Sequence, residues 1–560
     1  MVQSASRHPR AVLAERVASV PLARLERLCV VLLFIAALIP RVRDIAAEFD
    51  RGVDGEQGAF FAVAALNYER GDSAGIYPVL NVDRVARPDQ RFVYANHPPL
   101  VPLLAWNAVR ALGPAGWDSA WQRGEAPRDI ELPLRLPFLA AQLLALLLLW
   151  SVAREAYGAS VGLLTLAFGA ASSVGIHFAG LVNYENPGLA TALLGVLFGL
   201  RWIRGQRRAD LALAGAATAL GAAVTFGPLA CLPAMWFTAW RRRGLRKAAI
   251  YAAVTGACGL LPLALHHFAS RAALAGSLNP TALSVFERAQ LLLEPLVSGE
   301  VGLAAWLAIQ WELATTAHGL AIVVATCLAL SLRSVRALSP AFASSLSALE
   351  HPPREARDLP LLGILLSTGA LVLFAFYRHT SEPQWSFQLW WLPAFSVGGA
   401  LCVHQLSGPL LRLRAGLSPL VLLTLGLALP GLGAQAAWRL RTRGPDAPLP
   451  MPRAAGAWIA SATHPGEFVQ HDRALGLNLA VGFYAWRTLL PSPSPDDPTG
   501  ARVQAALGLD DRSRYWLGAS PDGPLGSVAP TPSSLIEREP VGADQMWRLW
   551  RIAPSAPEDV

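Results

Sequence analysis

The sequence predicts an all-α polytopic membrane protein of about eleven transmembrane helices, with interfacial helices in its first outer loop and a small C-terminal α/β domain. Three observations lead to this fold class. Of the 560 residues, 53% are hydrophobic and 15% are charged, a more apolar balance than that of ordinary soluble proteins. Apolar runs that could cross a bilayer recur along most of the chain. Clusters of arginine separate these runs, which is typical of cytoplasmic loops.

The predicted spans begin at residue 28 and end at residue 437. The first covers 28–42, and the basic segment before it, residues 1–27, is expected to be cytoplasmic. Further spans are predicted at 132–152, 160–178, 187–203, 211–226, 228–240, 248–267, 313–332, 359–376, 387–403 and 417–437. Together they form a transmembrane domain over residues 28–438.

The distribution of arginine gives the topology. The short outer connections hold only three arginines, Arg271, Arg288 and Arg378, and most of the others fall on inner connections. The arginines fall on inner connections only if residues 98–113 do not cross the membrane. Three prolines and Arg110 in this segment favour an interfacial helix, which belongs to a long first outer loop over 43–131.

The composition changes at about residue 439. Proline, glycine and serine increase, and the apolar runs shorten to the length of strands. We expect residues 439–560 to form a small α/β domain. An odd number of crossings from a cytoplasmic N-terminus places this domain outside, on the periplasmic face.

Several function classes have no support in the sequence. The net charge of +8 comes from arginines between apolar runs, so we expect no nucleic-acid partner. No phosphate-binding loop, dinucleotide-binding fingerprint or HExxH motif is present, and the five cysteines lie in apolar runs without metal-ligand spacing. We therefore expect no metal and no cofactor.

Acidic residues gather where the chain leaves the first span. Five carboxylates fall within thirteen residues: Asp44, Glu48, Asp50, Asp54 and Glu56. Acids gathered at a membrane surface are costly to leave without water or partners, so their presence suggests a site there. Asp54 precedes a helical pattern over 58–68, so it could be a helix N-cap, or a general base that takes a proton from a hydroxyl. Glu56 and Asp50 are its nearest rivals.

Three further outer segments supply candidate substrate contacts. His97, before Pro98 and Pro99, could hydrogen-bond a phosphate or a sugar, or could merely precede the interfacial helix. Glu185 lies in a short acidic connection, where Asn186 could instead cap the next helix. The third segment, 377–393, carries Arg378, His379 and Gln384 among tryptophans that could form an interfacial belt. An arginine and a histidine there could hold a lipid phosphate, and Arg135 could face the same site or snorkel to the surface.

Taken together, these residues resemble the GT-C superfamily of integral-membrane glycosyltransferases, in particular its bacterial protein O-mannosyltransferase-like branch, glycosyltransferase family 39. The motifs that carry the resemblance are DGEQGAFFAVAALNY (54–68), YANHPPL (94–100) and NYENP (183–187). The architecture corresponds over essentially the whole chain, whereas the specific motifs lie within about the first 190 residues.

The resemblance implies a donor, a location and roles for these residues. The donor would be a polyprenyl-phosphate-linked sugar at the outer face of a bacterial inner membrane, and the acceptor a protein, lipid or glycan. The catalytic acid falls on Asp54 with Glu56 beside it, although Gly55 interrupts the usual acidic pair, and the second acidic position falls on Glu185. A direct, inverting transfer with a phosphate leaving group would need no metal.

Two other functions stay open at this point. A transporter or flippase of lipid-linked saccharides would have charged residues in mid-membrane and often internal repeats, whereas here the ionisable residues cluster at the outer face. A polymerase or ligase of surface polysaccharide shares the lipid-linked donor.

Overall fold

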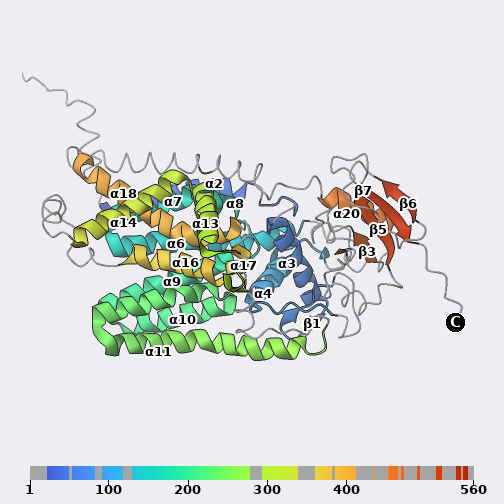
Figure 1. Cartoon of the computed structure of the whole chain (residues 1–560), viewed down its shortest axis with the longest axis horizontal. Coiled ribbons are helices and arrows are strands. Elements are labelled where there is room, and N and C mark those ends of the chain that lie inside the picture. The colour runs from blue at the N-terminus through green and yellow to red at the C-terminus, as the bar shows by residue number, and fades with distance from the viewer. Residues whose placement is uncertain are drawn as a thin grey trace, which may run out of the picture.

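The computed structural model describes residues 22–43, 45–49, 53–81, 91–117, 129–277, 293–294, 296–299, 301–338, 360–380, 385–411, 433 and 452–463, together with five strands of the C-terminal region. A helical bundle makes up most of this part of the chain, and a sheet lies beyond one end of it (Figure 1). The predicted span over 417–437 lies outside the described residues, apart from residue 433.

The helices of the bundle run mostly along its long axis (Figure 1). Those in the first half of the chain are α2 (Leu22–Val42), α6 (Glu131–Tyr157), α7 (Ala159–Ala171), α8 (Ser173–His177), α9 (Glu185–Gly205), α10 (Arg208–Val224), the 3₁₀ helix η2 (Gly227–Cys231) and α11 (Leu232–Leu274). Those in the second half are α13 (Leu303–His318), α14 (Leu320–Leu338), α16 (Leu361–Ala375), α17 (Tyr377–Thr380), the 3₁₀ helix η4 (Trp385–Trp391) and α18 (Leu392–Leu411).

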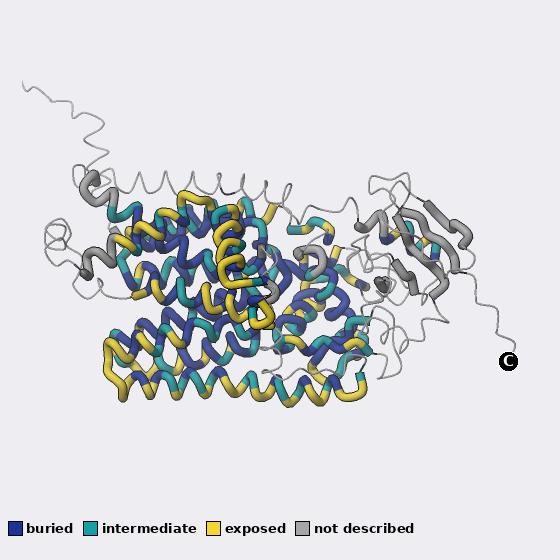
Figure 2. The backbone as a smooth tube through the Cα atoms, viewed as in Figure 1, coloured by how far each residue is buried: buried dark blue, intermediate teal, exposed yellow. Residues whose placement is uncertain are grey.

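Several of these helices have the length and composition of membrane spans. In the described part of the chain, four are long and apolar enough to cross a bilayer, or up to five if a bent pair counts as one span. Their burial follows their position: α9 is largely enclosed, whereas α11 is exposed along the outside of the bundle (Figure 2). Leu260, Leu261 and Phe268 of α11 are all exposed, as expected for side chains that face lipid. The chain is therefore a multi-pass membrane protein.

Two predicted spans differ from the helices observed. The expectation of one helix over 313–332 is wrong, because Gly319 has a φ of +86° and the axes of α13 and α14 differ by 111° there. The span predicted at 160–178 is also not one continuous helix, since α7 ends at Ala171 and α8 begins at Ser173. The spans predicted at 228–240 and 248–267 are joined as η2 and α11, which changes direction at Gly244, where φ is +78°.

The first loop adds a smaller layer at one end of the bundle. It contains α3 (Val53–Glu69), a hairpin of β1 (Ser73–Ala74) and β2 (Tyr77–Pro78), and α4 (Leu100–Leu112). Helix α4, predicted as interfacial, packs on α3 and α6 and leaves Leu104 and Leu112 exposed. Phe61 and Phe138 lie in the apolar cluster that joins this layer to the bundle.

The C-terminal region contains helix α20 (Pro452–Ala462) and one mixed sheet. The strands are β3 (Phe468–His471), β4 (Leu489–Pro491), β5 (Ser513–Ala519), β6 (Arg538–Ala543) and β7 (Trp547–Ile552), in the order β4-β3-β5-β7-β6. Strand β3 pairs in parallel with β4 and β5, whereas β7 pairs antiparallel with β5 and β6. In Figure 1 this sheet lies on the side of α3 and α4.

Candidate functional site

Helix α3 carries the predicted catalytic acids in its first turn. It begins at Val53, so Asp54 is the second residue of the helix and not its N-cap, which would precede Val53. Glu56 is in the same turn, and the side chains of both acids lie outside what the structure describes. The backbone nevertheless places both residues at the end of the bundle where α3 packs on α6 and α4.

Arg135, near the start of α6, supports the segment that leads into α3. Its guanidinium donates hydrogen bonds to the carbonyl oxygens of Ile45, at 3.2 Å, and Ala47. It also lies 5.2 Å from the ring centroid of Phe49, over the face of the ring. The side chain of Arg135 is only 3% exposed, so it neither snorkels to the surface nor points into an open site. It supports the backbone of the first part of the acidic stretch, ahead of α3.

Gly58 lets Phe49 pack directly on α3. A Cβ atom at residue 58 would collide with the Phe49 ring, which is completely buried. The absence of a side chain therefore allows the approach of ring and helix. Arg135, Phe49 and Gly58 together hold the first turn of α3 against the start of α6, and we call these three residues the α3 brace.

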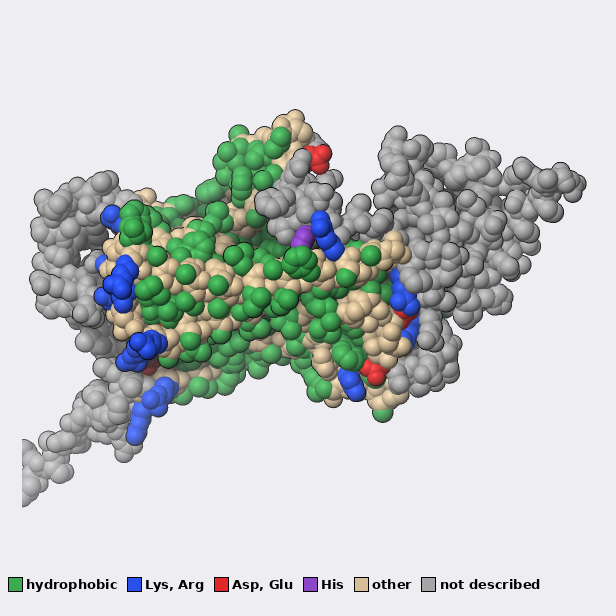
Figure 3. Space-filling model, turned by 90° about the horizontal axis from the view of Figure 1, so that it is seen from below, with side chains coloured by type: hydrophobic (Ala, Val, Ile, Leu, Met, Phe, Trp, Pro, Cys, Tyr) green, Lys and Arg blue, Asp and Glu red, His purple; other side chains and the backbone are tan. Residues whose placement is uncertain are grey.

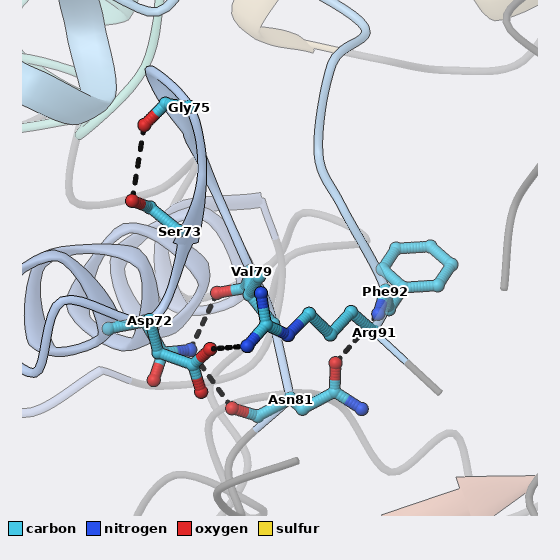
Figure 4. A network of polar contacts seen from close by, with 8 residues as sticks. Asp72, Ser73, Gly75, Val79, Asn81, Arg91 and Phe92 are labelled. Carbon is cyan, nitrogen blue, oxygen red and sulfur yellow. Dashed lines mark hydrogen bonds and ion pairs between the residues drawn. The ribbon is translucent and has the colours of Figure 1, made fainter. Parts of the chain in front are cut away.

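A polar network fixes the other end of α3 (Figure 4). Asn67 Nδ2 donates to the carbonyl oxygens of Val79, at 2.6 Å, and Asn81, at 2.9 Å. Asp72, which is buried, forms an ion pair with Arg91 at 3.4 Å. These contacts join α3 to two extended segments, and the second of these segments leads to His97.

The loop from residue 91 to residue 99 is held by its neighbours. The Tyr94 amide donates to the carbonyl oxygen of Pro78 at 3.0 Å, and the Tyr94 ring packs on Phe60 of α3 with the ring centroids 4.5 Å apart. Tyr77 ties the hairpin to α11, because its hydroxyl lies 2.7 Å from His266 Nδ1. The position of His97 is thus set by both α3 and the bundle.

His97 contacts the segment that contains Glu185. The imidazole of His97 stacks on the ring of Tyr184, with centroids 4.2 Å apart and planes 25° apart. Burial raises the pKa of the Tyr184 hydroxyl well above its usual value, because a phenolate would be desolvated there. Tyr184 is therefore a neutral stacking partner, and Glu185 is the next residue in the chain. Phe61 of α3 also contacts Tyr184, with centroids 5.7 Å apart.

The start of α9 is capped differently from the expectation. Asn183 Oδ1 accepts a hydrogen bond from the Glu185 amide at 3.1 Å. The side chain of Asn186 instead donates to the carbonyl oxygen of Phe178 at 2.9 Å, so the predicted cap by Asn186 is wrong. The Glu185 carboxylate is half-buried and forms no hydrogen bond or ion pair with another residue in the described part of the chain.

Two residues of the connection between α10 and η2 lie beside His97, and Trp390 of η4 packs on the start of η2. Thr225 Oγ1 lies 3.5 Å from His97 Nδ1, and the centroid of the Phe226 ring is 6.0 Å from that of the imidazole. The Trp390 indole packs so closely on Gly188 and Gly227 that a Cβ atom at either residue would contact it. Thr225 and Phe226 were not expected in this site, and Trp390 was expected only among the tryptophans of an interfacial belt. The Phe226-Gly227-Pro228 break between apolar runs predicts a turn but gives no indication of its neighbours.

The segment that contains Arg378 and His379 is anchored to α13. Gln310 Nε2 donates to the Thr380 carbonyl at 2.7 Å, Gln388 Nε2 donates to Gln310 Oε1 at 3.2 Å, and the Trp306 indole donates to Thr380 Oγ1 at 2.9 Å. His318, at the bend between α13 and α14, lies 3.1 Å from the Gln388 carbonyl. These bonds fix α17 and η4 in the bundle.

The structure therefore brings together some of the predicted site residues. His97 and the Glu185 segment are in contact through Tyr184, and the helix of Asp54 and Glu56 packs on both. The side chains of Arg378 and His379 lie outside the described residues, as does all of Gln384. In the part of the chain that is described, no group of three or more His, Cys, Asp or Glu residues is arranged to hold a metal ion.

Comparison with known proteins agrees with this architecture. Residues 128–266 match the family model of dolichyl-phosphate-mannose-protein mannosyltransferases. ArnT from Cupriavidus metallidurans bound to undecaprenyl phosphate aligns with 94% of this chain and 98% of its own, with a TM-score of 0.54 and 14% identity. No curated protein sequence matches the chain.

A second fold similarity is to an archaeal enzyme. The Archaeoglobus fulgidus oligosaccharyltransferase, tethered by a disulfide bond to an acceptor peptide with the NVT sequon, aligns with 88% of this chain and 69% of its own, with a TM-score of 0.53 and 14% identity. The resemblance to GT-C glycosyltransferases that the sequence motifs indicated is confirmed by the family model and by these folds.

Proposed function

We propose that this chain, which resembles the GT-C glycosyltransferases, transfers a sugar from a polyprenyl-phosphate donor to an acceptor hydroxyl at the outer face of a bacterial inner membrane. One observation carries the proposal: the His97 imidazole stacks on Tyr184, beside Glu185, where α3 brings the first-loop acids to the bundle. The fold similarity to ArnT, solved with undecaprenyl phosphate, supports a lipid-phosphate donor.

The proposed reaction is a direct, inverting displacement. Asp54 takes the proton of the acceptor hydroxyl, and the oxygen attacks the anomeric carbon of the sugar. The bond from that carbon to the phosphate oxygen breaks, and the polyprenyl phosphate leaves with the electron pair. Glu56 and Asp50 are the alternative bases.

The remaining residues would bind the donor and the acceptor. Arg378, with His379 or His97, would stabilise the negative charge that grows on the leaving phosphate. Glu185, whose carboxylate forms no hydrogen bond or ion pair with another described residue, would accept hydrogen bonds from a sugar or acceptor hydroxyl. Gln384 would be a further contact with the sugar. A sugar can donate hydroxyl hydrogen bonds to the carboxylate and amide oxygens of these residues and can pack on the neighbouring aromatic rings.

The test is sugar transfer in membranes. Labelled sugar on polyprenyl phosphate is supplied to membranes that contain the wild type, Asp54→Asn, or the control Glu312→Gln, which alters an exposed acid on α13. We expect Asp54→Asn to reduce transfer by roughly 10²-fold or more, and the control to keep full activity. Unchanged transfer by Asp54→Asn would reassign the base to Glu56 or Asp50. No transfer by the wild type, with altered movement of lipid-linked sugar across the membrane, would overturn the proposal.

A further inference from the structure

The end of the bundle opposite the candidate site carries exposed cations. Helix α9 starts at Glu185 in the site and ends at Gly205, so the α9–α10 turn lies one helix length away. Arg207, Arg208, Arg241, Arg246 and Lys247 are exposed in this turn and at the change of direction of α11. We call these five residues the cationic rim. Figure 3 shows Lys and Arg side chains gathered at this end of the apolar surface.

The two parts of the cationic rim, in the α9–α10 turn and in α11, are held side by side. Arg243 donates hydrogen bonds to the carbonyl oxygens of Ile203 and Arg204, at the C-terminal end of α9. A guanidinium in this position satisfies carbonyl groups that the helix leaves without partners. The positive φ of Gly244 reverses the chain immediately afterwards, so the cations at 241–247 remain beside those at 207–208.

Two of the acids at this end, Glu155 and Glu26, already have partners. Glu155 forms ion pairs with Arg204, at 2.7 Å, and with Arg201, at 3.7 Å. Glu26 pairs with Arg154 at 2.5 Å. In the described ranges, no acidic side chain lies within ion-pair distance of a residue of the cationic rim. Within the described ranges, no ion pair therefore neutralises the positive charge of the rim.

Exposed apolar groups adjoin the cations. Phe237 and Trp240 are 56% and 50% exposed and form an edge-to-face pair, with centroids 5.7 Å apart. Leu245, between Arg243 and Arg246, is 74% exposed. Aromatic residues beside exposed arginine and lysine are typical of the boundary between acyl chains and headgroups. A partner at this surface must present negative charge next to hydrocarbon.

We propose that the cationic rim binds the headgroups of anionic phospholipids, with Phe237, Trp240 and Leu245 against the adjoining acyl chains. A basic segment next to an anionic leaflet is attracted by the negative surface potential of that leaflet. Zwitterionic lipids offer the same hydrocarbon without the net charge. The rim therefore selects lipids by charge and attaches the α9–α10–α11 end of the bundle to one leaflet.

The test compares lipid binding by three forms of the full-length protein. The rim variant combines Arg241→Gln, Arg246→Gln and Lys247→Gln, and the control combines Arg110→Gln and Arg271→Gln, two arginines on α4 and at the far end of α11. Each is placed in nanodiscs of phosphatidylcholine with or without phosphatidylglycerol. We measure the unfolding temperature and the phosphatidylglycerol retained after extraction in detergent. We expect phosphatidylglycerol to raise the unfolding temperature of the wild type and the control, and the rim variant to lose most of this shift and of the retained lipid.

Three results would overturn the proposal. Equal retention by the rim variant and the wild type would remove the rim from lipid binding, and equal loss in rim variant and control would indicate a general charge effect. If the rim variant does not fold, the phosphatidylglycerol retained by the wild type is measured at 0.05 M and 1 M salt. Because the rim is exposed, salt screens its charge and should weaken lipid binding. No decrease at high salt would also contradict the proposal. None of these measurements depends on sugar transfer.

Discussion

The two ends of the helix bundle use arginine in opposite ways. At the site end, Arg41 and Arg135 are each 3% exposed and direct their N–H groups to backbone carbonyls. At the opposite end, Arg201 is exposed and pairs with Glu155 at 3.7 Å, and its neighbours Arg207 and Arg208 face outward. The buried guanidinium groups hold irregular backbone in place, whereas most of the exposed ones contribute charge to the surface; Arg243, which donates to the last carbonyls of α9, is the exception at the opposite end.

Burial explains the difference. Within the bundle, a carbonyl group that loses its donor has no water to replace it, so the side chain that supplies the donor is part of the fold. At the exposed end, each charge is partly solvated and screened by salt. Substitutions at the site end should therefore have larger effects than substitutions of exposed arginines, in the following order.

Arg41→Ala is expected to have the largest effect on stability. Arg41 donates to Gln142 Oε1 at 2.9 Å and to the carbonyl oxygens of Ala170, at 2.9 Å, and Gly169, at 3.1 Å, which end α7. Removal leaves these acceptors buried without donors, at a cost of roughly 3 kcal/mol or more. Denaturation in detergent should show this loss. Arg41→Lys, which keeps the charge and part of the donor set, should recover some of it; no recovery would mean that the shape of the guanidinium is essential.

Arg135→Ala is expected to affect transfer more than stability. Loss of the α3 brace releases the carbonyls of Ile45 and Ala47, and with them the segment that leads to Asp54. A displacement of about 1 Å at a catalytic group can reduce turnover by roughly 10²-fold. We expect kcat to fall by this order with KM for the donor little changed, and Arg135→Lys to restore part of kcat. A rise in KM with kcat unchanged would instead assign Arg135 to substrate binding.

Gly58→Ala tests the same brace from the helix side. The added Cβ collides with the Phe49 ring, and overpacking of this kind costs roughly 1–3 kcal/mol. Combination with Phe49→Leu should remove part of the cost, so that the two changes are not additive in a double-mutant cycle. Additive losses would show that Phe49 and Gly58 stabilise the fold independently.

Much of the fold could be predicted from the sequence, because hydropathy and arginine clusters are local signals. The His97 and Glu185 segments were both assigned to the outer face, but their contact through Tyr184 was not predicted. The α3 brace could not be predicted, because Arg135 and Ile45 are 90 residues apart and no periodic pattern joins them. The bend at Gly319 was missed because an isolated glycine in an apolar run is compatible with a continuous helix. The cap by Asn186 was expected because the helix was predicted to start at residue 187, whereas α9 starts two residues earlier, at Glu185, a feature that sequence patterns resolve poorly.

Arg201→Gln is expected to have the smallest effect. Arg201 lies 3.7 Å from Glu155, its side chain is 43% exposed, and Arg204 binds the same carboxylate at 2.7 Å. Exposed ion pairs contribute about 0–1 kcal/mol, and the remaining pair keeps Glu155 neutralised. We therefore expect a loss of less than about 0.5 kcal/mol, measured by denaturation beside Arg41→Ala in the same detergent. A loss comparable to that of Arg41→Ala would show that this end of the bundle is as strongly held by its arginines as the site end, and the contrast between the two ends would fail.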